Sequence, residues 1–263
     1  MKQFVEAFSP NRAVSGTTMR LLAAVSAAFA LVAWSLVPTK IIPHPLDVID
    51  AFGSLWTRTT IGQDAITSVT LNIEAIALST AISASLAYLS VLSGLRPSIE
   101  FASKLRFLGL TGLSFIFGLS FTGHALKLVL LTFGMSVFLL TSMVSVVASI
   151  PKEQFDYART LRMSPWRATY EVVVLGTMDQ MIEAVRQNAA IGWVMLTLVE
   201  GLVRSEGGIG MLLLNENKHI RLETVFALQI LVLTIGLMQD YSIGVIRNLF
   251  CPWSDLDSSK GGK

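Results

Sequence analysis

The sequence predicts an all-α integral membrane protein with about six transmembrane helices. Of its 263 residues, 52% are hydrophobic and only 14% are charged, whereas soluble domains average about 25% charged residues. Long apolar runs recur along the chain, and polar or proline-containing stretches separate them. In lipid every backbone polar group must be paired within a helix or a closed barrel. Runs this continuously apolar lack the alternation of barrel strands, so helices are expected.

Six apolar runs are long enough to span a membrane. A helix needs about 20 apolar residues, with a lower limit near 17, to cross roughly 30 Å of hydrocarbon. The runs that meet this requirement are 21–37, 67–93, 106–122, 125–149, 186–203 and 224–246. The first is read as a retained span because no A-x-A cleavage site follows it. Residues 1–20 are predicted to be a cytosolic segment, 21–250 the transmembrane domain, and 251–263 a disordered cytosolic tail.

The distribution of basic residues predicts the orientation of the chain. With the N-terminus inside, 14 of the 20 Lys and Arg residues fall on cytosolic segments and six on external ones. Basic residues accumulate on cytosolic loops of membrane proteins. Both termini are therefore predicted to be cytosolic, and residues 151–175 to face the cytosol.

Two external segments carry signals of local structure. Pro45 suits the first position of a helix, and apolar residues follow it at helical spacing, so a short amphipathic helix is expected there. The glycines within 206–210 break the chain before a helical stretch at 211–222. The third and fourth runs are separated only by the very short turn at 122–124.

The segment 151–175 is an unusually polar insert in this apolar chain. Its charged residues are Lys152, Glu153, Asp156, Arg159, Arg162, Arg167 and Glu171. Pro151 fits the start of a helix on which Phe155, Ala158 and Leu161 form a narrow apolar stripe. Ser164-Pro165 reads as an N-cap followed by a first-turn proline. The insert is therefore predicted to be helix, turn, helix.

Two uses of the insert are consistent with these residues. Trp166 lies beside Arg167 at the start of the second predicted helix, and this pair of residue types is enriched at protein–protein hot spots. This favours a docking site for a cytosolic protein. The alternative is a solvated connecting loop whose apolar residues rest against the membrane surface.

The insert resembles the cytosolic motif of bacterial ABC importer permeases, Glu-Ala-Ala, three residues, Gly, nine residues, Ile-x-Leu-Pro. The aligned residues are Asp156-Tyr157-Ala158, Arg159-Thr160-Leu161, Arg162 and Val172-x-Val174-Leu175. The nitrate, sulfonate and taurine branch often reads Ala-Arg-Thr-Leu-Gly-x-Ser-x-Trp-Arg, which residues 158–167 match except at Arg162. Residues 42–48 and 208–210 are similar to other motifs of that branch, so the resemblance covers roughly residues 35–250.

The resemblance implies a type I ABC importer permease (MetI-like) fold whose insert is a coupling helix docked on an ABC ATPase dimer. The residues it implies for that contact are Asp156, Tyr157, Ala158, Arg159, Thr160, Arg162, Ser164, Trp166 and Arg167. No phosphate-binding G-x-x-x-x-G-K-[ST] motif occurs in the chain. ATP and Mg would accordingly be held by the partner ATPase, and this chain would be a transporter subunit rather than an enzyme.

The resemblance also implies the rest of an importer. Further partners would be a second permease subunit, forming a homodimer, and a periplasmic or lipid-anchored solute-binding protein. The substrate would be a small solute such as nitrate, a sulfonate, taurine or bicarbonate, and the chain would lie in the bacterial inner membrane. The alternatives are one half of a heterodimeric permease for another substrate, or a non-transporting scaffold that recruits a cytosolic protein.

Several residues depart from the motif. Tyr157 replaces an alanine, Leu175 replaces the proline, and Asp156 keeps the negative charge on a shorter side chain. Arg162 replaces the glycine, which permits positive φ. Arg162 therefore implies either an ordinary helical φ at this position or a strained backbone.

Ionisable residues within spans are candidates for function because burial in lipid is costly. Glu74 either lines the translocation pathway or pairs with a basic residue of another helix. Glu200 is a pathway candidate, although its i, i+4 spacing to Arg204 favours a surface ion pair. Asp240, near the inner end of the last span, is expected to contact another helix or snorkel to the interface.

The remaining pathway candidates come from the resemblance and lie in the fifth run. They are Gln187, Asn188 and Trp193, of which Trp193 also suits a packing role. The three histidines, His44, His124 and His219, are scattered without a paired carboxylate, so neither a catalytic constellation nor a metal site is predicted. The small net charge of +2 argues against nucleic-acid binding.

Overall fold

The computed structural model describes residues 16–36, 42–58 and 60–252, and within them the secondary structure is entirely helical. Most of the predicted cytosolic tail and most of the predicted N-terminal segment lie outside the described residues; Cys251, the first residue of that tail, is buried. The elements are α2 (Gly16–Ser35), α3 (Pro45–Arg58), α4 (Ile61–Leu89), α5 (Arg96–Lys104), the 3-10 turn η1 (Leu105–Phe107), α6 (Leu110–Gly118), α7 (Gly123–Ala148), α8 (Lys152–Thr160), α9 (Pro165–Ala168), the π-helix η2 (Thr169–Leu175), α10 (Met178–Leu202), the 3-10 turn η3 (Arg204–Glu206), α11 (Ile209–Lys218) and α12 (Leu222–Phe250).

Four helices of the described residues are long and apolar enough to cross a membrane. They are α2, α4, α7 and α12, which correspond to the first, second, fourth and sixth predicted runs. The fifth run lies on α10, a 25-residue helix whose first three turns include the charged residues Asp179, Glu183 and Arg186. The structure thus shows four candidate spans rather than the six that the sequence predicted.

The third predicted run is not a single helix. A helix already begins at Arg96, where Pro97 occupies the first turn, and it ends at Lys104. Leu108 and Gly109 are extended before α6 begins, because glycine has a low helix propensity and frees the backbone to turn. The prediction of a span at 106–122 was therefore wrong in its boundaries. The break at 122–124 is present, and Gly123 adopts a φ of +58° there.

Small side chains let α4 approach its neighbours closely. Its buried face carries Ser68, Ala75, Ser79, Ser83 and Ala87 at roughly one-turn spacing. Stripes of small residues allow close van der Waals packing between helices in lipid, where no hydrophobic driving force joins them. The Ser83 hydroxyl also donates a 2.9 Å hydrogen bond to the Ser136 carbonyl of α7. The α4–α7 pair forms the centre of the bundle.

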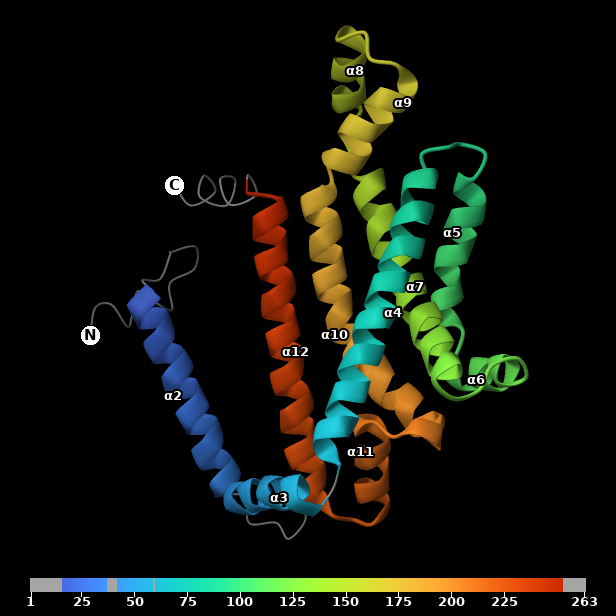
Figure 1. The fold of residues 1–263 in the computed structure, drawn as a ribbon. Helices are drawn as coiled ribbons and strands as arrows, with labels where there is room; N and C mark the ends of the chain where they lie inside the picture. Colours follow the sequence, from blue (N-terminus) through green and yellow to red (C-terminus); the bar gives the residue numbers. More distant parts are fainter. Residues whose placement is uncertain (1–15, 37–41, 59, 253–263) are drawn as a thin grey trace.

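The two ends of the bundle differ. At one end α8 and α9 project beyond α4, α5 and α7, and the C-terminal end of α12 lies on this side (Figure 1). At the other end lie α3 and α11, with α3 running across the ends of α2 and α12 (Figure 1). None of the residues of α2 is buried, although Trp34 near its end stacks on Phe226 of α12 with ring centroids 6.0 Å apart.

Candidate functional site

The first helix of the insert ends in a backbone motif that normally requires glycine. The Met163 N–H donates to the Ala158 carbonyl at 3.2 Å, and the Arg162 N–H donates to the Arg159 carbonyl at 2.9 Å. These two bonds define a Schellman motif with Arg162 as the first residue beyond the helix cap. Its φ is +54°, which costs a residue with a Cβ about 1 to 2 kcal/mol. Of the two possibilities left open by the sequence, the strained one is present.

The second helix of the insert begins where the sequence predicted. The Ser164 hydroxyl accepts a 3.4 Å hydrogen bond from the Arg167 N–H, and Pro165 occupies the first helical position. The predicted helix, turn, helix is therefore confirmed. The predicted apolar stripe is only partly buried: Ala158 is buried, whereas Leu161 is 53% exposed because the chain has already turned out of the helix.

The insert presents aromatic side chains to solvent. Tyr157 and Trp166 are 67% and 71% exposed, and Tyr170 is also exposed. Two local ion pairs flank them, Asp156–Arg159 at 3.1 Å and Arg167–Glu171 at 3.7 Å. Exposed pairs of this kind contribute less than about 1 kcal/mol each. Large aromatic groups held beside guanidinium groups on a projecting helical element form a suitable surface for protein docking.

Glu74, a pathway candidate, is paired. Its Oε2 lies 3.0 Å from Nε2 of His124, at the start of α7, and both side chains are about half exposed. The pairing role proposed for Glu74 is thus present, although its partner is a histidine. The expectation that His124 has no paired carboxylate was wrong, because the two residues are 50 positions apart and neither helix carries a local signal of their contact.

Glu200 is not part of a surface ion pair. It is completely buried; its Oε1 accepts from the Ser68 hydroxyl at 2.6 Å and its Oε2 accepts from the Gly210 N–H at 2.8 Å. Arg204 instead donates to the Gly201 carbonyl. The predicted Glu200–Arg204 pair was therefore wrong, because the chain bends after Leu202 and α11 folds back against α10.

The same buried polar cluster holds the glycine-rich loop before α11. Asp64 accepts from the Gly208 N–H at 2.8 Å, and buried Lys127 donates to the Gly207 carbonyl at 2.9 Å. Gly208 has a φ of +111°, and a Cβ there would overlap the Glu200 carboxylate. Carboxylates from α4 and α10 thus bind the free N–H groups at the start of α11, where the helix dipole favours negative charge.

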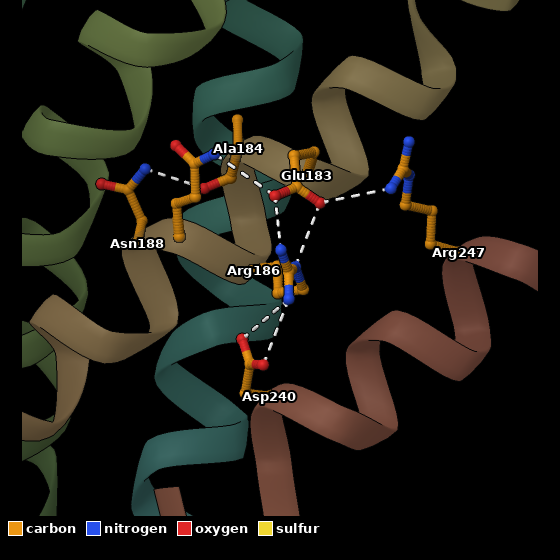
Figure 2. A network of polar contacts seen from close by, with 7 residues as sticks. Glu183, Ala184, Arg186, Asn188, Asp240 and Arg247 are labelled. Atoms are coloured by element: carbon orange, nitrogen blue, oxygen red, sulfur yellow. Dashed lines mark hydrogen bonds and ion pairs between the residues drawn. The ribbon is translucent and has the colours of Figure 1, made fainter. Parts of the chain in front are cut away.

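An ion-pair network joins α10 to α12 near the end that carries the insert (Figure 2). Arg186 donates to Glu183 at 2.7 Å and to Asp240 at 3.1 Å, and Arg247 lies 3.6 Å from Glu183. The inter-helix role expected for Asp240 is confirmed. Glu183 and Arg186 were not predicted as network residues, although their i, i+3 spacing was a usable signal.

Gln187 and Asn188 lie on opposite sides of this network. Gln187 donates to Glu183 at 3.3 Å and lines a cavity of about 350 Å³ between α7, α10 and α12. Asn188 is buried and donates to the Ser142 hydroxyl at 3.2 Å and to the Ala184 carbonyl at 2.8 Å. Asn188 therefore joins α10 to α7 and does not line that cavity.

Trp193 takes part in a polar contact of three helices. Its Nε1–H and the Nδ2 of Asn72 both donate to Oε1 of Gln239, at 2.9 and 2.8 Å. Trp193 is 6% exposed and packs against Leu196 and Met135, so the packing role is present. It also lines a groove of about 340 Å³ between α10 and α12, which keeps it a pathway candidate.

The candidate residues therefore form separate groups rather than one site. The nine residues of the insert lie together on α8, α9 and their turn, whereas Glu74 and Glu200 contact different partners near the opposite end. Of the pathway candidates, Gln187 and Trp193 line cavities beside α10. Among the described residues no three His, Cys, Asp or Glu side chains are close enough to hold a metal ion.

Comparison with known proteins gives one informative similarity. None of the known protein-family models matches the chain. A protein of Methanocaldococcus jannaschii that is provisionally named an ABC transporter permease is 25% identical over 115 residues. The aligned region covers 44% of this chain and 43% of that protein, so the chain spans less than half of the relative's length.

Proposed function

We propose that the chain is the transmembrane permease subunit of an ATP-driven ABC importer, without enzymatic activity of its own. Three observations support the proposal. Four helices have the length and composition of membrane spans, residues 156–175 resemble the permease coupling motif, and an archaeal protein named as an ABC permease is similar over part of the chain.

The observation that carries the proposal is the projecting insert. Helices α8 and α9 project beyond the end of the bundle (Figure 1), and they carry the exposed aromatic side chains of Tyr157 and Trp166. Exposed apolar patches that are rimmed by polar residues mark sites of interaction with other proteins or membranes. On this proposal the cytosolic ATPase dimer binds ATP and Mg and receives the insert as its coupling helix.

The connection between the insert and the bundle suggests how force is transmitted. The π-helix η2 (Thr169–Leu175) leads into α10 through Gly176 and Thr177, and the Thr177 hydroxyl donates to the Val173 carbonyl at 2.6 Å. A displacement of the insert would therefore move α10. The contact of Arg186 with Asp240 would pass this movement on to α12.

The proposal extends to the assembly and its cargo. A second permease subunit, in a homodimer, would complete the pathway, and a periplasmic or lipid-anchored binding protein would deliver a nitrate-, sulfonate-, taurine- or bicarbonate-like solute. The chain would cross the bacterial inner membrane several times with both termini in the cytosol. Residues 21–250 would be the permease domain and 251–263 a cytosolic tail.

Replacing Trp166 with aspartate tests the docking role. We expect co-purification of the cognate ABC ATPase to fall by more than about 30-fold, since hot-spot residues contribute 2 kcal/mol or more. Solute-stimulated ATP hydrolysis should be lost with it. Trp56→Asp is the matched control, because Trp56 is 65% exposed on α3 at the opposite end, and it should leave ATPase binding unchanged.

The outcomes separate the alternatives. If Trp166→Asp leaves both co-purification and hydrolysis unchanged, the docking assignment is wrong. If the ATPase binds but no solute stimulates hydrolysis in the presence of the cognate binding protein, the chain is a recruiting scaffold rather than a transporter.

A further inference from the structure

The turn between α8 and α9 holds an arginine in a conformation that glycine would adopt without strain. Arg162 has a φ of +54°, and the two backbone hydrogen bonds of the Schellman motif hold it in this conformation. Its side chain is exposed, so packing within the chain does not account for it. Strained residues that persist in a fold often serve a function through the side chain.

Arg162 also differs from the two nearby arginines of the insert in its ion pairing. Arg159 pairs with Asp156, and Arg167 pairs with Glu171. Among the residues that the structure describes, no carboxylate lies within 4.0 Å of the Arg162 guanidinium, and its side chain makes no hydrogen bond. The turn thus presents an available guanidinium group. In the sequence, Arg162 lies between Tyr157 and Trp166, whose aromatic rings are exposed.

We infer that Arg162 pairs with a carboxylate of the protein that receives the insert, and that this pair selects the partner. The inference rests on the proposed ATPase docking. The receiving surface would combine an apolar pocket for Trp166 with an aspartate or glutamate at its rim, opposite the turn. A planar guanidinium binds a carboxylate through two parallel hydrogen bonds, which a lysine would not reproduce.

Selection follows from what a mismatched partner would do. An ATPase without the acidic residue would remove water from Arg162 without replacing its hydrogen bonds, and this penalty acts against binding. A glycine at this position, as in the motif that the insert resembles, carries no such requirement. The arginine therefore restricts the chain to an ATPase with the complementary acid.

The test measures affinity between the full chain in nanodiscs of zwitterionic lipid and its purified cognate ABC ATPase. We expect Arg162→Gly to weaken binding about tenfold and Arg162→Glu about 100-fold, because the first removes the pair and the second opposes two like charges. The salt dependence of binding should be smaller in Arg162→Gly than in the unmodified chain. Changing an acidic ATPase residue that cross-links to the turn into arginine should restore binding to Arg162→Glu.

Two controls keep the result interpretable. Ile220→Gly relieves the same kind of strain, a φ of +57° at an exposed residue at the end of α11, and should leave affinity unchanged. Because glycine suits both positions, neither glycine variant should misfold.

Unchanged affinity in Arg162→Gly and Arg162→Glu would overturn the inference, while loss of binding in Trp166→Asp would still support docking. If anionic lipid in the nanodisc abolishes the effect of Arg162, the guanidinium binds phosphate headgroups and the inference is wrong.

Discussion

Replacing Glu200 with alanine is expected to lower the free energy of unfolding of the purified chain by about 3 to 5 kcal/mol. This is the range for removing one partner of a buried charged contact. The variant would leave the Ser68 hydroxyl and the Gly210 N–H without their acceptor. It would also remove one of the two carboxylates that share a buried cluster with Lys127. All of these groups lie away from water, so none could be satisfied by solvent.

Thermal unfolding in detergent, followed by tryptophan fluorescence, measures this effect. For a chain of this size about 1 kcal/mol corresponds to roughly 2 to 4 °C, so the midpoint should fall by on the order of 10 °C. Glu100→Ala is the control, since Glu100 and Arg96 form a largely exposed ion pair of small energetic value. A shift no larger than that of Glu100→Ala would show that the buried cluster does not hold the loop before α11.

Replacing Glu183 with alanine is expected to open the end of the bundle that carries the insert to thiol reagents. Cys251, the single cysteine of the chain, is completely buried beyond the end of α12. Burial and the nearby Asp179 carboxylate raise the pKa of its thiol, so little reactive thiolate forms at neutral pH. Glu183 bridges Arg186 and Arg247, so its loss removes one of the two ion pairs that tie α10 to α12 and leaves the Arg186–Asp240 pair in place.

The rate of maleimide labelling at neutral pH measures this opening. Hydrogen bonds to charged groups contribute about 1.5 to 3 kcal/mol, so labelling should be between about 10 and 100 times faster in Glu183→Ala. Glu216→Ala removes an ion pair with Arg221 at the opposite end and should leave the rate unchanged. Labelling of Glu183→Ala at the unmodified rate would mean that the network does not close the end of the bundle that carries the insert.

Local sequence signals predicted the parts of the structure that local physics determines. Pro45 begins α3, Ser164 caps α9, and the glycines at 207 and 208 separate α10 from α11. Each depends on the backbone preferences of one or two residues. The departure at Arg162 also located the strained turn, because glycine at this position of a motif indicates positive φ.

Contacts between distant residues could not be predicted in this way. Ser68 and Glu200 are 132 positions apart, and neither signals its partner within its own helix. The i, i+4 rule assigned Glu200 to Arg204 because it considers only one helix. The broken segment between Arg96 and Gly118 was missed for a related reason, since a hydropathy pattern measures apolar content and does not detect where a helix stops.

Photo-cross-linking from the α8–α9 insert tests the proposal that this insert enters a cytosolic ATPase. A benzoylphenylalanine residue replaces Leu161, which is 53% exposed in the turn, and in a second variant replaces Ile220, which is 79% exposed at the opposite end. In membranes that contain the assembled complex, the account predicts a cross-link from the Leu161 position to the ATPase and none from the Ile220 position. No ATPase adduct from the Leu161 position, or one from the Ile220 position, would contradict it.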